Sequence, residues 1–85
     1  MTVRFHKNFE KKYRQLTKPQ KSKFQERVIT FQQDEFNPIL NNHALIGKYQ
    51  SYRSINITGD LRALYKKERD IIIFVALDSH SNLYG

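Results

Sequence analysis

The sequence contains no cysteine. Disulfide bonds and thiolate metal sites are therefore excluded, and the absence fits a reducing compartment. Long hydrophobic runs are missing as well, because the longest, residues 71–77, has seven residues, whereas a helix that spans a bilayer needs about 20. The first residues also lack the apolar core of a signal peptide. We therefore expect a cytoplasmic protein with no membrane partner.

Acidic residues are scarce, above all in the first third of the chain. The sequence carries 15 Lys and Arg against 8 Asp and Glu, a formal net charge of +7. Residues 1–33 hold nine basic and two acidic residues, whereas residues 34–85 hold six of each, so the whole excess lies in the N-terminal third. This asymmetry favours an anionic partner, nucleic acid first and an acidic protein segment second, over a merely solubilising surface. The cationic residues that we expect to contact RNA there are Lys11, Lys12, Arg14, Lys18, Lys21 and Lys23.

Apolar spacing in the first 35 residues predicts one strand and then two helices. Residues 2–5 alternate as in a strand. Between the two helices, Thr17 and Gln20 have the spacing of a capping box, and Pro19 suits a first helical turn. Each helix carries an apolar stripe at positions i, i+4 and i+7, formed by Phe9, Tyr13 and Leu16 in the first and by Phe24, Val28 and Phe31 in the second.

The last third of the chain predicts three strands after a loop at residues 36–42. We place the strands at residues 52–57, 61–67 and 71–77, with a Gly59-Asp60 turn between the first two. The last strand is apolar on both faces and should be central in the sheet. The order β-α-α-β-β-β over residues 1–85 predicts a single α+β domain, with a mainly antiparallel four-stranded sheet and a two-helix hairpin packed on one face.

Four short motifs carry a family resemblance: GKY at 47–49, YRS at 52–54, GDLRALY at 59–65 and SHSNLY at 79–84. Together they resemble the RelE/ParE toxin superfamily, and most of all its YafQ-like branch of bacterial type II toxin–antitoxin systems. The resemblance implies a RelE-like fold and a toxin that a cognate antitoxin holds silent. Such a toxin is expected to be monomeric or weakly dimeric alone and hetero-oligomeric with its antitoxin.

The branch of the superfamily decides the function that the resemblance implies. YafQ-like members enter the ribosomal A site and cut mRNA, so ribosome and mRNA are the expected partners. ParE-like members share the fold, lack the nuclease residues and act on DNA gyrase. We expect a ribosome-dependent mRNA endonuclease; the alternatives are a ParE-like gyrase inhibitor and a noncatalytic RNA-binding relative. No cofactor is expected, and no metal, because the three histidines lack ligand spacing.

Two histidines are the expected acid–base groups. RNA cleavage through the ribose 2′-OH needs groups that exchange protons near neutral pH, which histidine does. His80 matches the C-terminal histidine of the resembled family and is the expected general acid; the alternative is a surface histidine. His43 matches the family's His-x-Leu-x-Gly element and is expected to assist catalysis or RNA positioning; the alternative is a solvated loop residue.

Further candidates come from the same motifs. Asp60 matches a family aspartate, although Gly-Asp is also ordinary turn chemistry. Arg62 could stabilise phosphate charge or form an ion pair on the sheet surface. Tyr84 matches the terminal aromatic of the family and could stack on a base or pack against the core. Arg53 could assist RNA binding, although its place in the strand favours a structural role.

One position departs from the resembled family. YafQ-like proteins often carry a second catalytic histidine on the strand where this chain has Asn56, and an acidic residue where it has Ser54. Asn56 can hydrogen-bond a phosphate or a 2′-OH, so we count it among the RNA-binding candidates. It cannot exchange protons near neutral pH, and cleavage would then depend on His43 and His80.

Overall fold

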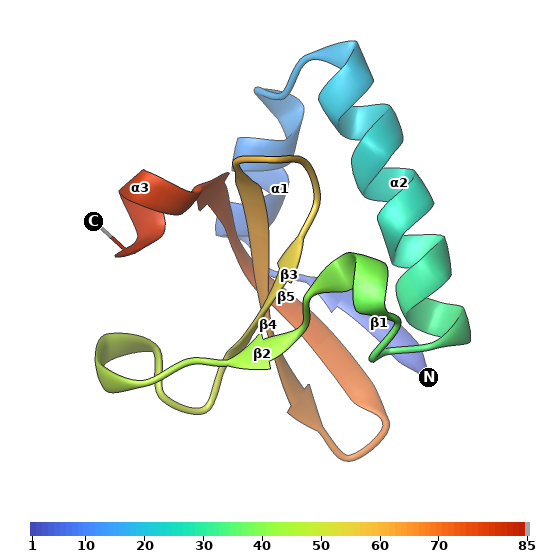
Figure 1. Cartoon of the computed structure of the whole chain (residues 1–85), viewed down its shortest axis with the longest axis vertical. Helices are drawn as coiled ribbons and strands as arrows, with labels where there is room; N and C mark the ends of the chain where they lie inside the picture. Colours follow the sequence, from blue (N-terminus) through green and yellow to red (C-terminus); the bar gives the residue numbers. More distant parts are fainter. Residues whose placement is uncertain (85) are drawn as a thin grey trace.

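The computed structural model describes residues 1–84, except for the side chain of Tyr84. Its centre is a five-stranded sheet with the strand order β1-β5-β4-β3-β2. β1 runs parallel to β5, and all other neighbouring strands are antiparallel. The strands are β1 (Thr2–Phe5), β2 (His43–Ala44), β3 (Arg53–Asn56), β4 (Leu61–Glu68) and β5 (Ile71–Ser79) (Figure 1).

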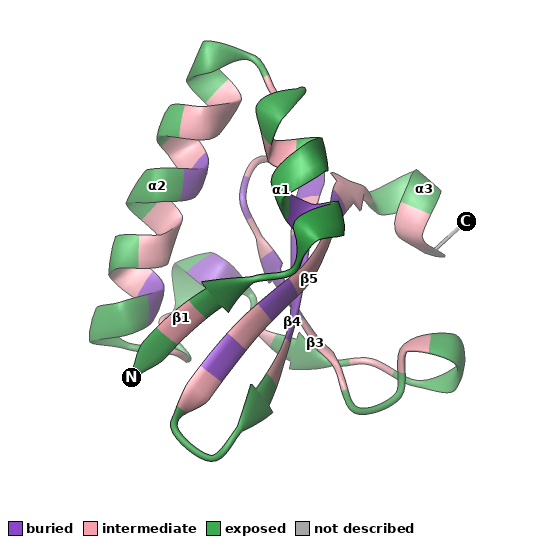
Figure 2. Cartoon of the chain, turned by 180° about the vertical axis from the view of Figure 1, so that it is seen from behind, coloured by how far each residue is buried: buried purple, intermediate pink, exposed green. Residues whose placement is uncertain are grey.

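Two helices cover one face of the sheet, and a third, short helix follows its longest strand. In Figure 2 the buried parts of the two covering helices face the sheet. We call the face that they leave uncovered the open face. The helices are α1 (Lys7–Arg14), α2 (Lys18–Gln33) and α3 (His80–Tyr84), and two short 3₁₀ helices are η1 (Pro38–Leu40) and η2 (Gly47–Tyr49).

The junction between α1 and α2 is held by the predicted capping box. The backbone N–H of Gln20 donates to Thr17 Oγ1 at 3.3 Å, and the N–H of Thr17 donates to Gln20 Oε1 at 2.9 Å. Pro19 lies in the first turn of α2, where a missing N–H costs nothing. These local bonds let α2 start soon after α1 ends, so the two helices form the expected hairpin.

The covered face of the sheet meets the helices in an aromatic core. Phe74 of β5 is fully buried. Five rings surround it at centroid distances of 5.6–5.8 Å, and they belong to Phe5, Phe9, Phe24, Phe31 and Tyr65. β5 lies between β1 and β4, so the prediction that this strand is central is confirmed.

The α+β class and the order of the main elements are confirmed, with two differences in detail. The sheet has a fifth strand, β2, where no strand was expected, and α3 follows the last strand, where no helix was expected. β2 has two residues and exists because it pairs with β3. α3 begins where Ser79 Oγ accepts the N–H of Asn82 at 3.2 Å. Elements this short carry no periodic signal in the sequence.

The strand register determines which side chains share the open face. His43 of β2 lies opposite Ser54 of β3, which lies opposite Leu64 of β4. Asn56 lies opposite Arg62, which in turn lies opposite Asp78 of β5. Directly opposed residues project to the same side of a sheet. His43, Asn56 and Arg62 therefore belong to one surface, on the side away from α1 and α2.

Candidate active site

A trough runs along β5 beside the start of α1. It consists of two adjoining hollows of about 430 and 480 Å³ that share Asn8, Val75 and Ala76. A register shift in the β4–β5 pairing lies at this level, so the strand bulges where the hollows meet. We call these hollows together the β5 trough. Its first half is also lined by Lys11, Lys12, Gln15, Leu77, Asp78 and Leu83, and its second half by His6, Tyr49, Tyr52, Lys66 and Ile73.

His43 is exposed on β2, and its ring has a defined partner. Its Nδ1 lies 2.8 Å from the carbonyl oxygen of Asn41. A carbonyl can only accept, so Nδ1 carries the proton and the neutral ring keeps a lone pair on Nε2. A neutral imidazole with an open lone pair is a general base. His43 thus has a ring nitrogen that can accept a proton, and its role in catalysis stays a prediction.

His80 is the first residue of α3, and its backbone binds the turn between β3 and β4. Its N–H donates to the carbonyl oxygen of Asp60 at 2.9 Å. The structure therefore brings His80 and Asp60 together, although they lie 20 positions apart in the sequence. The bond uses the backbone of both residues, and His80 is exposed at the start of α3.

Arg62 uses its guanidinium to brace the same turn. Its Nη1 donates to the carbonyl oxygens of Thr58 at 2.9 Å and Leu61 at 3.3 Å, and its Nη2 donates to that of Gly59 at 3.2 Å. Three of the five N–H donors of Arg62 thus hold the turn. In this arrangement the side chain stiffens the support of His80 and does not extend into the β5 trough.

Asp78 fastens α3 to α1 and to the sheet. Its Oδ1 accepts the N–H of Ser79 at 2.8 Å and the amide of Asn82 at 3.0 Å, and its Oδ2 lies 3.3 Å from Lys12 Nζ. Burial alone would raise the pKa of Asp78, but these hydrogen bonds and Lys12 outweigh it and hold the pKa below its usual value. The charged carboxylate therefore anchors the helix that begins at His80.

Asn56 lies half-buried beside Arg62 on the open face. Its side-chain Oδ1 is buried and has no hydrogen-bond partner among the described residues. A buried acceptor without a donor costs about 1–3 kcal/mol, so such groups are uncommon and often mark functional sites. Asn56, the residue that departs from the family pattern, thus lies on the open face with a buried Oδ1 that no described residue satisfies.

A hydrogen-bonded network beneath β2, which the sequence did not indicate, holds His43 in place. Tyr65 OH donates to Glu35 Oε2 at 2.6 Å and accepts from the amide of Asn42 at 2.7 Å. Arg53 Nε donates to Asn42 Oδ1 at 2.7 Å. Asn42 precedes His43 directly, so the network fixes the backbone from which the His43 ring projects. Arg53 thus takes part in this network through its Nε, and its role in RNA binding stays a prediction.

The electrostatics of this network keep Glu35 charged and Tyr65 neutral. Burial and the hydrogen bond to Glu35 raise the pKa of the Tyr65 hydroxyl. Burial also pushes the pKa of Glu35 upward, but the hydrogen bonds from Tyr65 and Lys67 outweigh that effect and lower it. Lys67 Nζ lies 3.0 Å from Glu35 Oε1. The network therefore keeps its charge pattern across the neutral pH range.

We expect Tyr65→Phe to lower the free energy of unfolding by about 1–3 kcal/mol, because Glu35 and Asn42 each lose a buried partner. The ring itself still packs on Phe31, at a centroid distance of 4.9 Å. Urea denaturation measures the change. Tyr52→Phe removes a hydroxyl outside the network and should change stability by less than about 0.5 kcal/mol. Equal stability of Tyr65→Phe and the parent protein would contradict the network.

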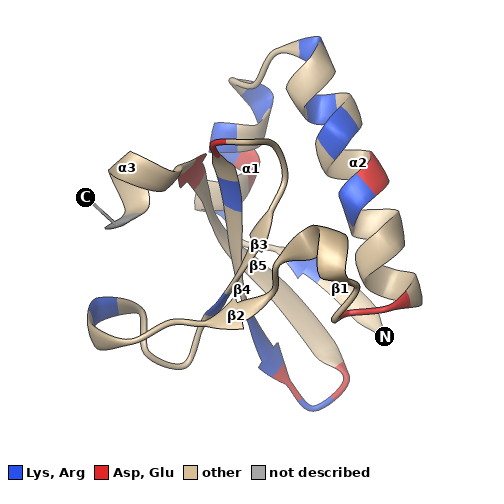
Figure 3. Cartoon of the chain, viewed as in Figure 1, with Lys and Arg blue, Asp and Glu red and all other residues tan. Residues whose placement is uncertain are grey.

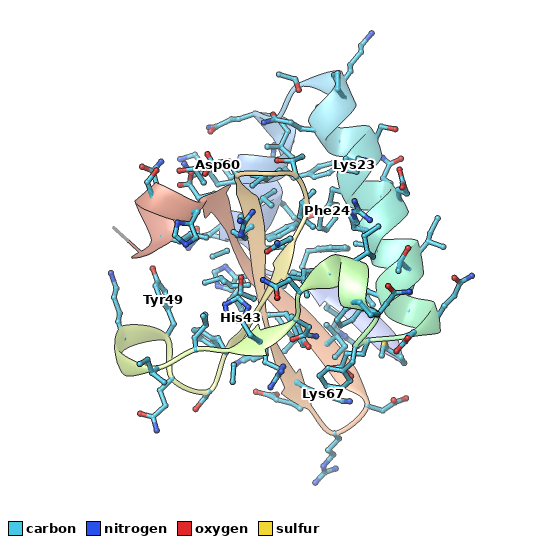
Figure 4. The ribbon with its side chains drawn as sticks, in the orientation of Figure 1. Lys23, Phe24, His43, Tyr49, Asp60 and Lys67 are labelled. Carbon is cyan, nitrogen blue, oxygen red and sulfur yellow. The ribbon has the colours of Figure 1, made fainter. Side chains whose placement is uncertain are left out.

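The six cationic residues expected to bind RNA do not form one surface. Lys11 and Lys12 line the β5 trough. Arg14 lines a separate apolar groove between α1 and α2. Lys21 lies 5.8 Å from the centroid of the Tyr13 ring, and Lys23 lies 3.5 Å from Glu26. Figure 3 shows the basic residues of α2 on its first part, where Lys18 begins the helix, and the last turn carries none. Figure 4 shows His43 and Tyr49 away from that helix.

The comparisons with known proteins identify the family. A family model described as the bacterial toxin YafQ of type II toxin–antitoxin systems matches residues 1–85. The chain belongs to the YafQ toxin family. Similar solved structures include a copper-bound mutant toxin from Helicobacter pylori, with 26% sequence identity, a TM-score of 0.80 and 99% of each chain covered.

YafQ itself has the same fold as this member of its family. The crystal structure of YafQ from E. coli has a TM-score of 0.77 at 18% identity, covering 98% of this chain and 97% of that one. YafQ in the E. coli DinJ–YafQ complex has a TM-score of 0.70 at 18% identity, with the same coverage. A comparison with curated proteins gave no match.

Tyr84 is the last residue of α3 in this YafQ-family chain, but its side chain lies outside the described part of the structure. The expectation that it stacks on an RNA base therefore stays a prediction. Among the described residues, no three His, Asp or Glu side chains gather in a metal-binding arrangement. Within that same part of the chain, no helix has the length and apolarity needed to cross a membrane.

Proposed function

We propose that this type II toxin is an mRNA endonuclease that acts on the ribosome and cleaves RNA through the ribose 2′-OH. The observation that carries the proposal is the state of His43, whose Nδ1 proton is committed to the carbonyl of Asn41 at 2.8 Å, so that Nε2 can accept a proton. The ring stands on the open face, which also holds Asn56 and Arg62. A base that can take the proton of the 2′-OH suits RNA cleavage.

In the proposed reaction, His43 and His80 act as base and acid. His43 Nε2 takes the proton of the 2′-OH, and the 2′-oxygen attacks the adjacent phosphorus. The bond from phosphorus to the 5′-oxygen breaks, and that oxygen leaves with a proton from His80. The products are a 2′,3′-cyclic phosphate and a 5′-hydroxyl. Lys11 and Lys12 bind the phosphate backbone nearby, because cationic side chains supply most of the affinity for RNA.

Asp60 and Arg62 support His80 in this proposal. Arg62 holds the turn through the carbonyls of Thr58, Gly59 and Leu61, and Asp60 of that turn accepts the backbone N–H of His80. Both residues therefore act through His80, as positioning residues. We favour cleavage over gyrase inhibition because both histidines are present and the bond to Asn41 O leaves Nε2 of a neutral His43 ring able to accept a proton.

The proposed partner that silences the toxin is a cognate antitoxin with an apolar, amphipathic segment. An apolar groove of about 450 Å³ lies between α1 and α2, on the face away from His43. Ile29 on its wall is exposed, although it is large and hydrophobic. The solved toxin–antitoxin complex of E. coli YafQ with DinJ supports an antitoxin as the partner. The apolar lining of the groove comprises Phe5, Phe9, Tyr13, Phe24, Val28 and Ile29.

Mapping of mRNA 5′ ends after induction of the toxin in bacteria tests the proposed function. We expect new ends inside translated codons, and their loss when the start codon of the same message is destroyed, because cleavage requires translation. Inhibition of growth with intact mRNA and arrested DNA replication would overturn the proposal and point to gyrase. Cleavage that persists without a start codon would overturn its dependence on the ribosome.

A further inference from the structure

The second half of the β5 trough is a separate hollow with an unusual lining. It measures about 480 Å³, within the range of roughly 300–1,000 Å³ that holds small organic groups. Its floor is apolar, formed by Ile73, Val75 and Ala76 of β5. Its walls carry two tyrosines, an imidazole, an amide and one ammonium group, which belong to Tyr49, Tyr52, His6, Asn8 and Lys66. None of these five was among the residues expected to form the site.

The loop at residues 45–52 is built to hold its tyrosines over the sheet. The N–H of Leu45 donates to Tyr52 O at 3.1 Å, which closes the loop, and the N–H of Tyr52 donates to Tyr49 O at 3.0 Å. Gly47 has φ +68°, a conformation that glycine adopts without strain. Both tyrosines are half-buried, with ring centroids 6.4 Å apart. In Figure 4 Tyr49 projects from this loop toward α3.

The polar groups of the hollow are mainly hydrogen-bond donors and cations. His6 Nδ1 accepts the N–H of Asn8 at 3.1 Å, so a neutral His6 ring carries its proton on Nε2 and can donate it. Arg4 lies opposite Ile73 in the β1–β5 register and therefore projects to the same face as the floor. Lys66 is 3.1 Å from Glu68, an acidic residue that does not line the hollow.

These properties match a nucleobase, which has a flat aromatic face and acceptor atoms on its edges, next to an anionic backbone. We propose that the hollow is a base-binding subsite for single-stranded RNA. An unstacked base rests on the Tyr49 ring, its edge accepts from His6 Nε2 or the amide of Asn8, and Lys66 binds the adjoining phosphate. The RNA continues along the trough toward Lys11. This subsite rests on the proposed function, because it takes RNA as the substrate.

The proposal is tested by the binding of short 2′-O-methyl RNA, which cannot be cleaved through the 2′-oxygen. Stacking of a base on an aromatic side chain contributes about 1–3 kcal/mol, so Tyr49→Ala should weaken binding by about 5- to 150-fold. Tyr49→Phe keeps the ring and should bind within about twofold of the parent protein. Ile46→Ala is the matched control, because Ile46 is 91% exposed on the same loop and does not line the hollow.

An RNA series that lacks one base at a time separates stacking from a general effect on the loop. At one position, loss of the base should weaken binding to the parent protein as much as Tyr49→Ala does. The same RNA should cause no further loss with Tyr49→Ala, because the stacking partner is already gone. Equal affinities of Tyr49→Ala and the parent protein would overturn the subsite. The subsite would also be overturned if Tyr49→Ala and removal of the base weakened binding independently, or if the parent protein did not bind the RNA.

Because the RNA is not cleaved, the outcome is separate from that of the proposed function. If the parent protein shows the Tyr49 dependence but cuts no mRNA on ribosomes, the subsite stands and the endonuclease proposal fails. If it cuts mRNA and Tyr49→Ala binds RNA with unchanged affinity, the endonuclease proposal stands and the subsite fails.

Discussion

His80→Ala is expected to slow mRNA cleavage by about 10²–10⁴-fold, the usual contribution of a general acid. His80 is exposed, and its backbone N–H donates to Asp60 O at 2.9 Å, a bond that alanine retains. The fold should therefore remain, and the loss should be one of chemistry. Single-turnover cleavage of mRNA on purified ribosomes measures the effect.

The pH dependence of that rate distinguishes a proton donor from a residue that only shapes the site. A general acid works only while it carries its proton, so the rate of the parent protein should decline at alkaline pH. The residual rate of His80→Ala should lack this alkaline decline. Ser81→Ala, on the same exposed turn of α3, should keep both the rate and the pH profile. A folded His80→Ala protein with an unchanged rate would show that the acid lies elsewhere.

Phe74→Ala is expected to unfold the protein or bring it close to unfolding. Replacing a buried phenylalanine with alanine costs about 3–5 kcal/mol, whereas a small domain is stable by only about 5–15 kcal/mol in total. Phe74 is fully buried and contacts rings from β1, α1, α2 and β4. A cavity at this position therefore weakens every contact between the sheet and its helices.

Circular dichroism during urea denaturation measures this loss. Phe74→Leu keeps part of the volume, so it remains measurable if Phe74→Ala does not fold, and it should lose less stability than alanine. Phe36→Ala is the control for removal of a phenylalanine, because Phe36 is 60% exposed. This variant should lose far less stability than Phe74→Ala. A loss below about 1 kcal/mol for Phe74→Ala would contradict a core organised around this ring.

The main elements could be predicted because each buries a periodic set of side chains. The stripes of Phe9 and Tyr13 in α1, and of Phe24 and Phe31 in α2, pack on the sheet as expected. The apolar sequence of β5 marked it as central because it is covered on one face and paired on both edges. The capping box at Thr17 was readable because its bonds join residues three positions apart.

The short elements and the polar networks could not be predicted because tertiary contacts create them. β2 consists of two residues and depends on its pairing with β3. The bond between Tyr65 and Glu35 joins residues 30 positions apart, and no local pattern marks it. The hollow at Tyr49 likewise combines the N-terminal end of α1, a distant loop and two strands. Family motifs indicated His43 and His80, but not the contacts that hold them.

The position of Asn56 shows how sequence and structure complement each other. The sequence identified it as a departure from the family pattern. The structure adds that it faces the same surface as His43 and Arg62 and that its buried Oδ1 has no donor among the described residues. Cleavage by this chain therefore depends, in our proposal, on His43 and His80 without a third histidine between them.

The ends of the RNA fragments test the central claim most directly. Purified ribosomes carrying a defined mRNA are incubated with the toxin, and the upstream fragment is analysed by mass spectrometry. Cleavage through the 2′-OH predicts a 2′,3′-cyclic phosphate on that fragment, and no cleavage when the ribose at the cut site lacks its 2′-OH. An mRNA that stays intact, or an upstream fragment that ends in a 3′-hydroxyl, would contradict acid–base cleavage by His43 and His80.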